Sequence, residues 1–497
     1  MPKERKVEER RDFSGGMHTR QSKDQLGPEA LVEATNVRIS ERHGGLVKRL
    51  GSRRLHGTAI AAAGDVLGVQ QWDQGSATNQ LVATGDGDLF HKTSDYGEFT
   101  QVSPGTALST SKNLWGTMRT TSSGAALRLY FTDGVRFWRW SGSALTDVTA
   151  AGGAPLNVDF FKPYHLRAFW HDTDFENHIS WSVLGDPEDD STGDETQGGA
   201  TMVDVQRGEG LVAFETIGSS LLIASPESIA RFTGYSDRDI QIAQDVEGIS
   251  SEVGCVGPLA LRRIERFALM AATEGIFAIT ETEATSVSDK IEDQWDALDR
   301  STLSLANIGY HKGRREAWVA VPGVGESVPK TVFVLSLGAV NGWVKFTFPF
   351  GILNMASWED SSGAERIIAG CDDGFVRVLD EGTSDDATAA GAAGTIVTMQ
   401  AQLAPFFFGD ISEQKTLERV FLDADIASGT ELEVHYRFDA QSWRSLAIAG
   451  VGGGIQPYRL DAYGQGRRLD LRLVSRDAGT PKVTAVRPIA FAMSRWT

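Results

Sequence analysis

The sequence predicts an all-β protein built around a β-propeller, and three observations support this prediction. The 497 residues include 54 glycines against 15 prolines, a balance typical of many short strands joined by tight turns. Apolar and polar residues alternate over short stretches, as strands with one buried face require. Turn signals recur at a nearly constant spacing, which indicates a repeated unit rather than unrelated sheets.

The alternation is clearest on the two sides of Asp133-Gly134. Apolar residues occupy every second position of 127–131 and again of 135–138. An Asp-Gly pair between two such runs predicts a β-hairpin, because the pair supplies the positive φ angles that a two-residue primed turn requires. Further hairpins are expected around Asp86-Gly87, Glu227-Ser228, Glu274-Gly275 and Asp373-Gly374.

The spacing of these turns predicts the architecture. The second turn residues stand at 87, 134, 228, 275 and 374, with gaps of 47, 94, 47 and 99 residues. One period of about 47–50 residues fits every gap if a degenerate repeat lies in each long one, with turns near Asn177 and Gly325. Seven repeats of about four strands predict a seven-bladed β-propeller over residues 57–382. Six blades are the alternative if one degenerate repeat is an insertion, and an irregular stack of β-sandwiches is the alternative architecture.

The segments on either side of the repeats have different compositions. Residues 1–56 hold 13 Lys and Arg against 8 Asp and Glu, a local charge of +5, and are expected to form a basic N-terminal arm. Residues 383–394 are small and polar and predict a linker. Residues 395–497 return to alternation in longer strands and predict a C-terminal β-sandwich.

Little helix is expected. Pro28 is a favourable first helical residue, and a short helix is predicted from there toward Asn36. A hairpin turning at Gly44-Gly45 is expected to follow it. A second short helix is predicted after Asp293, through Trp295, Leu298 and Leu303.

Composition excludes several classes of protein. With 48 Lys and Arg against 66 Asp and Glu the chain carries −18, so tight static binding of nucleic acid is not expected. No apolar run approaches the ~20 residues of a membrane span, and the N-terminus lacks a signal peptide, so we expect folding in a cytoplasm and no stable membrane insertion. Cys255 and Cys371 have no metal-ligand or disulfide spacing and are expected to be buried thiols.

Chemical motifs are missing from the sequence. There is no phosphate loop, no Gly-x-Ser-x-Gly elbow and no His-Glu-x-x-His pair. The glycines at 323–325 and 452–454 do not lead from a strand into a helix, as dinucleotide binding requires. We therefore predict no catalytic, cofactor-binding or metal-binding residues, no cofactor and no enzymatic activity.

Three groups of residues have a competing functional interpretation. An acidic loop could collect a hard cation such as calcium, although it lacks the glycine of a calcium loop and a solvated loop is favoured. It comprises His171, Asp172, Asp174, Glu176, His178, Asp186, Glu188, Asp189 and Asp190. Glycosidase chemistry would need two facing carboxylates, whereas Asp86, Asp133 and Asp373 recur at equivalent turns and are interpreted as structural.

Two aromatic groups complete the candidates. Phe137, Trp138 and Trp140 could stack sugars or bases, but a blade core is favoured. The run Phe406-Phe407-Phe408 is either an exposed docking patch or a buried strand, and both interpretations remain open.

The N-terminal segment carries a family resemblance. Four motifs occur in order: DFSGGM at 12–17, PEAL at 28–31, ATNV at 34–37 and GGLVKRLG at 44–51. This order resembles the opening of bacteriophage tail proteins, namely the propeller-containing nozzle or hub (tail tubular) proteins of short-tailed phages. Where that family carries Arg-Pro-Gly, this chain has Arg49-Leu50-Gly51. Further similar segments lie at 179–187, 229–235, 254–258, 275–277, 436–439 and 463–467.

The resemblance implies a structural protein of the virion tail, made in the host bacterial cytoplasm. It implies a homo-hexameric ring below the portal and adaptor proteins, next to tail fibre or needle proteins, that retains the genome and lets dsDNA pass during ejection. An acidic conduit would repel the DNA backbone, so the genome would slide rather than stick. The basic arm would then anchor the ring against acidic neighbours. Two alternatives are a propeller-type tail hydrolase acting on host polysaccharide and a non-viral propeller scaffold that binds proteins.

Overall fold

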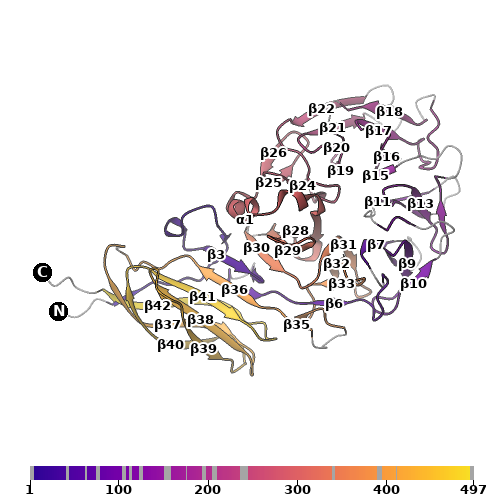
Figure 1. Cartoon of the computed structure of the whole chain (residues 1–497). Helices are drawn as coiled ribbons and strands as arrows, with labels where there is room; N and C mark the ends of the chain where they lie inside the picture. The colour runs from indigo at the N-terminus through magenta and orange to yellow at the C-terminus, as the bar shows by residue number, and fades with distance from the viewer. Residues whose placement is uncertain are drawn as a thin grey trace.

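The computed structural model describes most of the chain from residue 5 to residue 492. The described residues exclude 41–43, 62–63, 74–78, 103–107, 111–114, 122–126, 150–157, 175, 193–196, 204–209, 235–243, 339–341, 389–393 and 410. Tyr235 and part of the predicted linker therefore lie outside them. Figure 1 shows a ring of small sheets beside a pair of longer sheets.

The ring is a β-propeller, and in the described part of the chain it consists of seven four-stranded units. The first blade contains β7 (Val66–Trp72), β8 (Gln80–Gly85), β9 (Asp88–Lys92) and β10 (Thr100–Val102). The second contains β11 (Trp115–Thr121), β12 (Leu127–Thr132), β13 (Phe137–Trp140) and β14 (Leu145–Asp147). The third contains β15 (Val158–Tyr164), β16 (Arg167–Asp172), β17 (His178–Trp181) and β18 (Gly199–Met202). The next two are β19 (Ala213–Ile217), β20 (Ser220–Ala224), β21 (Ile229–Gly234) and β22 (Gln244–Ser250); and β23 (Leu261–Ile264), β24 (Phe267–Ala272), β25 (Gly275–Ile279) and β26 (Ala284–Ser286). The last two are β27 (Asn307–His311), β28 (Glu316–Pro322), β29 (Pro329–Ser336) and β30 (Trp343–Thr347); and β31 (Ile352–Glu359), β32 (Glu365–Cys371), β33 (Val376–Leu379) and β6 (Ser52–Arg54).

The predicted all-β propeller is confirmed, and so is the period that predicted it. Each of the seven expected turns marks the junction between the second and third strands of one blade, although at Glu274-Gly275 the turn lies one residue earlier, because Gly275 already belongs to β25 and pairs with Ala272. The two degenerate repeats are complete four-stranded blades, with their turns between β16 and β17 and between β28 and β29. They are hidden in the sequence because the loops at those turns are longer and lack an Asp-Gly pair.

The Asp-Gly turns themselves are not alike, which corrects one expectation. Asp86 and Gly87 both have positive φ, 51° and 80°, and connect paired residues Gly85 and Asp88 in a two-residue turn. At 133–134 and 373–374 only the glycine has positive φ, 81° in both cases. Those loops are longer, so a single left-handed residue suffices to reverse the chain.

The propeller closes with a strand from the start of the chain. β6 is the outer strand of the seventh blade, where Arg53 pairs antiparallel with Val378 of β33. This corrects the predicted boundary at residues 56 and 57, because part of the arm belongs to the propeller. The first and last segments of the ring are thereby joined by backbone hydrogen bonds.

The rest of the arm is built into the C-terminal sandwich. One sandwich sheet contains β36 (Met399–Leu403), β41 (Leu469–Ser475), β38 (Glu431–Phe438) and β39 (Arg444–Ala449). The other contains β42 (Lys482–Ala492), β37 (Lys415–Asp425) and β40 (Gln456–Gly466), extended by β1 (Arg5–Val7), β5 (Leu46–Lys48) and β4 (Val37–Ile39). The hairpin predicted around Gly44-Gly45 is the antiparallel pair β4–β5.

A single arm strand joins the sandwich to the propeller. β3 (Ala30–Thr35) lies between β30 of the sixth blade and β36 of the sandwich, so one sheet runs from blade to sandwich (Figure 1). The short strand β2 (Gly16–Met17) runs parallel to β3. The helix predicted from Pro28 is therefore wrong. Ala30, Leu31 and Ala34 are buried, and pairing with β36 outweighs a favourable helix start.

The predicted linker is also more ordered than expected. Ser384, Asp385 and Ala387 are buried, and Ser384–Asp385 forms β34, which pairs with β35 (Thr395–Ile396). We expected nothing here to be buried because the segment is small and polar. The acids are buried because they meet arginines of the arm, as described below.

Helix is scarce, as predicted. The segment after Asp289 contains α1 (Glu292–Asp296) between the 3₁₀ turns η4 (Asp289–Ile291) and η5 (Arg300–Leu305), with Trp295, Leu298 and Leu303 buried. Two other 3₁₀ turns are η1 (Lys23–Gln25) and η6 (Lys312–Arg314). In the residues that the structure describes, no helix has the length and apolar character needed to cross a membrane.

Candidate functional site

The arm, the last two blades and the predicted linker meet around buried arginines. Arg49, only 2% exposed, donates from Nη1 and Nη2 to the two carboxylate oxygens of Asp385 at 2.9 and 2.5 Å. Its Nε donates to Asn36 Oδ1 at 2.7 Å, and its guanidinium lies 4.3 Å from the ring centroid of Phe348. A planar guanidinium can make all these contacts at once, which a lysine cannot.

Two further arginines extend this arrangement. Arg38 makes two hydrogen bonds to the carboxylate of Glu316 in β28, at 2.9 and 3.0 Å, and an ion pair with Asp380. Arg377, which is fully buried, contacts Asp373 and Asp386. We call the ion pairs made by Arg38, Arg49 and Arg377 the junction network.

The network sets the protonation of its acids. Burial alone would raise the pKa of Asp380, but Arg38, His311 and Arg314 outweigh it and hold that pKa well below its ordinary value. Burial likewise opposes a lowered pKa at Asp386, where hydrogen bonds from Arg54 and Arg377 prevail. Both carboxylates are therefore ionised at neutral pH.

The basic arm is thus matched largely by acids of its own chain. Ion pairs within the chain engage Lys6 with Glu413, Arg10 with Glu8, Arg11 with Glu9, Arg20 with Glu292, Arg53 with Glu381 and Arg54 with Asp386, besides the junction network. The expectation that the arm's charge serves neighbouring subunits did not consider these partners. Many cations of the arm thus have acidic partners within the same chain, while the chain as a whole keeps its net charge of −18.

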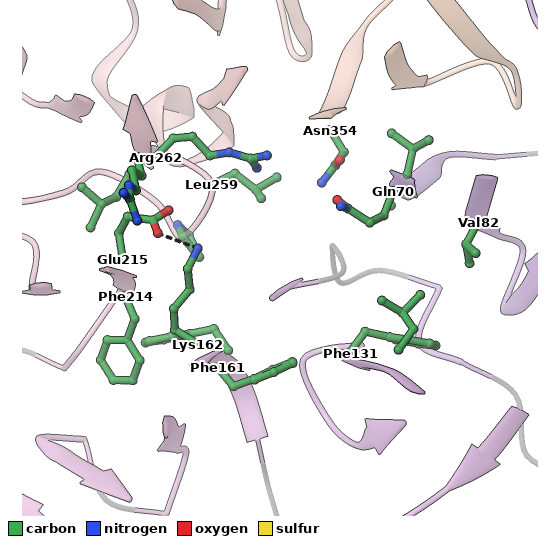
Figure 2. A pocket seen from close by; sticks show the side chains of 17 residues that line it. Gln70, Val82, Phe131, Phe161, Lys162, Phe214, Glu215, Leu259, Arg262 and Asn354 are labelled. Atoms are coloured by element: carbon green, nitrogen blue, oxygen red, sulfur yellow. Dashed lines mark ion pairs between the residues drawn. The ribbon is translucent and has the colours of Figure 1, made fainter. Parts of the chain in front are cut away.

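A second candidate site is a cavity of about 280 Å³ in the centre of the propeller. Inner strands of several blades line it, including β7, β15, β19, β23 and β31. Lys162 of β15 and Glu215 of β19 form an ion pair of 2.7 Å at its wall (Figure 2). Arg262 of β23 lines the same wall beyond Glu215.

The charge of Glu215 is stabilised by its surroundings. Burial would raise its pKa, but Lys162, Arg262 and the backbone N–H of Thr216 outweigh burial, so the pKa is lowered. The cavity wall therefore presents an ionised carboxylate between two cations.

Four residues of the acidic loop, His171, Asp186, Glu188 and Asp189, make local structural contacts, and the side chain of Asp172 lies outside the described part of the chain. Glu188 accepts hydrogen bonds from Tyr130 and Arg139, both at 2.6 Å, and Asp186 and Asp189 accept from backbone N–H groups. His171 is buried with Nε2 3.1 Å from the carbonyl of Glu176. Within the described residues, no three His, Cys, Asp or Glu side chains gather as metal ligands would.

The turn acids have structural contacts of their own. Asp133 is buried and accepts hydrogen bonds from the backbone N–H groups of Ser109, Val135 and Arg136. Asp373 pairs with Arg377 of the junction network. These contacts agree with the interpretation of the recurring acids as turn residues.

The aromatic candidates lie in the core. Phe137, Trp138 and Trp140 are at most 1% exposed, in agreement with the blade-core interpretation. Phe406 and Phe408 are buried as well, and Arg10 lies 4.3 Å from the ring centroid of Phe406. Phe407 is half-buried, and the run forms a single bridge at Phe406 rather than a strand, so burial is supported for Phe406 and Phe408 but the predicted strand is not formed. Cys255 and Cys371 are also buried, and burial raises the pKa of each thiol to about 12.

Sequence reasoning missed the cavity residues, although a signal for them exists. Lys162, Glu215 and Arg262 are 53 and 47 residues apart, close to the blade period. Aligning the repeats would have placed them on equivalent inner strands. The junction network had no such signal, because its partners come from unrelated segments.

Comparisons with known proteins found similarity in fold only. No protein-family model and no curated protein match the sequence. Among solved structures, the chain is similar to BBS1N crystallised in complex with ARL6DN, at 12% identity and a TM-score of 0.40, covering 67% of this chain and 96% of that one. It is also similar to the β-propeller domain of Cps50 (Swd1) from Myceliophteria thermophila, at 11% identity and a TM-score of 0.41, covering 65% and 98%. A third similar structure is BamB from Moraxella catarrhalis, at 13% identity and a TM-score of 0.38, covering 67% and 98%.

Proposed function

We propose that this chain is a structural subunit of a bacteriophage tail, a nozzle or hub protein that assembles into a hexameric ring below the portal and adaptor. In this role it retains the genome and conducts dsDNA during ejection, and it acts by assembly and shape rather than by catalysis. The proposal rests on the resemblance of the N-terminal motifs to that family.

The observation that supports the proposal most strongly concerns the N-terminal motifs: their residues lie at positions where the backbone geometry or close packing allows few other residue types. A Cβ at Gly51 would lie 1.9 Å from the carbonyl oxygen of Ser384, and one at Gly16 would lie 2.7 Å from Gly342 Cα. Asn36 has φ 55° and accepts hydrogen bonds from Arg49 Nε and the backbone N–H of Thr347. A chain that shares these motifs is therefore expected to share this junction between arm, blade and sandwich, which supports a common architecture.

The cavity in the centre of the propeller is too small for a DNA duplex, so the proposed conduit lies between subunits. A volume of about 280 Å³ equals a cube with an edge of about 6.5 Å, whereas the major groove of B-DNA alone is about 12 Å wide. In this proposal the duplex travels along the ring axis and not through a propeller. The net charge of −18 per chain would keep the backbone from adhering to the wall.

Electron microscopy of the purified chain tests the proposal. Negative-stain images, taken of the chain alone and together with portal and adaptor proteins of a short-tailed phage, are expected to show six-fold rings. Particles that remain single 53.8 kDa chains under both conditions would contradict the proposal. Steady turnover of a host polysaccharide by the single chain would favour the hydrolase alternative instead.

A further inference from the structure

The cavity in the propeller centre has a wall of alternating charge. Lys162, Glu215 and Arg262 stand on β15, β19 and β23, which are the inner strands of three consecutive blades. The ion pair of 2.7 Å uses the Lys162 ammonium to neutralise Glu215. Together the three side chains carry one positive charge in excess. Arg263 of β23 also borders the cavity, but its side chain is exposed and its Nε donates to the carbonyl of Glu265.

The opposite wall offers neutral polar groups. Gln70 of β7 and Asn354 of β31 line the cavity, and Figure 2 shows their side-chain amides directed toward one another across from the charged wall. Side-chain amides can donate to an oxyanion without adding charge. Phe131, Phe161 and Phe214 complete the lining with apolar surface.

The electrostatics of this cavity differ from those of the molecule as a whole. The chain is strongly acidic, yet the wall formed by Lys162, Glu215 and Arg262 comprises two cations and one acid. Charge interactions are stronger away from bulk water than on an exposed surface. A small anion is therefore favoured inside the channel, although the outer surface repels it.

We propose that the propeller channel binds a small molecule bearing an oxyanion, either a carboxylate or a phosphate, with Arg262 as its main charged contact. Asn354 would donate to the same group, as would the second N–H of the Gln70 amide, whose Nε2 already donates to the carbonyl of Gln71 at 3.2 Å. The phenylalanines would cover an apolar portion of the ligand. The volume of about 280 Å³ limits the ligand to a small metabolite and excludes a polymer. The inference goes beyond the proposed tail function and does not depend on it.

Calorimetric titration of the full chain with inorganic phosphate and with citrate, at constant ionic strength, tests the proposal. Saturable binding of at least one probe is expected, and the preferred probe identifies phosphate or carboxylate as the recognised group. Maltose, a neutral molecule, is expected not to bind.

Two substitutions should shift the affinity in opposite directions. Arg262→Gln is expected to weaken binding about tenfold, because it removes a charge-assisted hydrogen bond. Glu215→Gln is expected to tighten binding about tenfold, because it removes a repelling charge and frees Lys162 for the ligand. Arg459→Gln on the exposed face of β40 is the matched control and should leave the affinity unchanged.

The proposal would be overturned by several results. The absence of binding of both phosphate and citrate to the wild-type chain would overturn it. Equal affinities of the wild-type and Arg262→Gln chains for the probe would overturn it as well. If Arg262→Gln does not fold, Glu215→Gln decides alone, since glutamine has nearly the same shape as glutamate and removes only the negative charge. Unchanged or weaker binding in that variant would contradict an anion site.

Discussion

Arg49 shows how much of this fold depends on single side chains. It is a buried cation that reaches an acid 336 residues later in the chain, so its pairing with Asp385 joins the arm to the segment after the propeller. A buried ion pair adds little net stability compared with well-packed apolar residues, but removing one partner leaves the other as an uncompensated buried charge. The effect of a substitution therefore depends on whether one or both partners change.

Replacing Arg49 by methionine is expected to lower the free energy of unfolding by about 3–5 kcal/mol, because Asp385 would remain buried without its cation. Denaturant unfolding followed by tryptophan fluorescence measures the change. The double variant Arg49→Met/Asp385→Leu should recover part of the loss. Arg459→Met is the control, since its pair with Asp461 is more than half exposed and is worth about 0–1 kcal/mol. Equal losses for Arg49→Met and Arg459→Met would refute the role of the junction network.

Gly51 allows the closest approach between the arm and the segment after the propeller. Gly51→Ala is expected to destabilise the protein by about 1–3 kcal/mol, because the backbone at Ser384 has no room for a methyl group. Gly248→Ala is the control, since a Cβ there meets nothing within 4 Å. Thermal unfolding of both variants gives the comparison. A wild-type melting temperature in Gly51→Ala would show that this contact is looser than described.

The lowered pKa values of Asp380 and Asp386 predict acid sensitivity. On acidification the unfolded chain takes up protons at these carboxylates near pH 4, while the folded chain keeps them ionised to lower pH. Stability is therefore full above about pH 4 and falls as the pH decreases below it. Each such proton changes the free energy of unfolding by about 1.4 kcal/mol per pH unit in the range where only the unfolded chain is protonated.

The variant Asp386→Asn separates this effect from general acid unfolding. Its free energy of unfolding between pH 5 and pH 3 should decline less steeply than that of the wild-type chain, since one linked proton is gone. Denaturant titrations at several pH values measure both slopes. Identical slopes would mean that Asp386 titrates alike in the folded and unfolded states.

Among the elements, β3 and β6 connect the arm, the propeller and the sandwich, which were predicted from the sequence as separate domains. β6 closes the seventh blade and β3 continues the sixth blade into the sandwich. The blades and their period could be predicted from local alternation and turn residues. The arm strands could not be predicted in this way, because Ser52–Arg54 pairs with β33 and Ala30–Thr35 pairs with β30 and β36, all more than 300 residues away. The favourable helix start at Pro28 was outweighed by that distant pairing.

Deleting residues 1–56 is expected to prevent stable folding of both the propeller and the sandwich, because β6, β3, β4 and β5 are lost together. Circular dichroism and limited proteolysis of the truncated chain would show this. Deleting residues 1–4 alone is the control and should leave the unfolding transition unchanged. A stable, cooperatively folded chain lacking residues 1–56 would mean that the arm is a dispensable appendage.

At the scale of the whole molecule, many cations of the +5 arm have acidic partners within the chain, and the chain keeps a net charge of −18. The positive charge of residues 1–56 could be counted from the sequence, but the acids with which the arginines of this segment pair could be identified only from the structure. The central cavity likewise could not be predicted from single blades, since Lys162, Glu215 and Arg262 form one wall only when the blades stand in a ring.

The most direct test of this account is an electron cryomicroscopy reconstruction of the assembled particle with DNA in its tail. We predict six copies of the chain around one axis, with duplex density on that axis and none inside any propeller channel. Duplex density through a propeller, or particles in which the chain surrounds no common axis, would contradict the account.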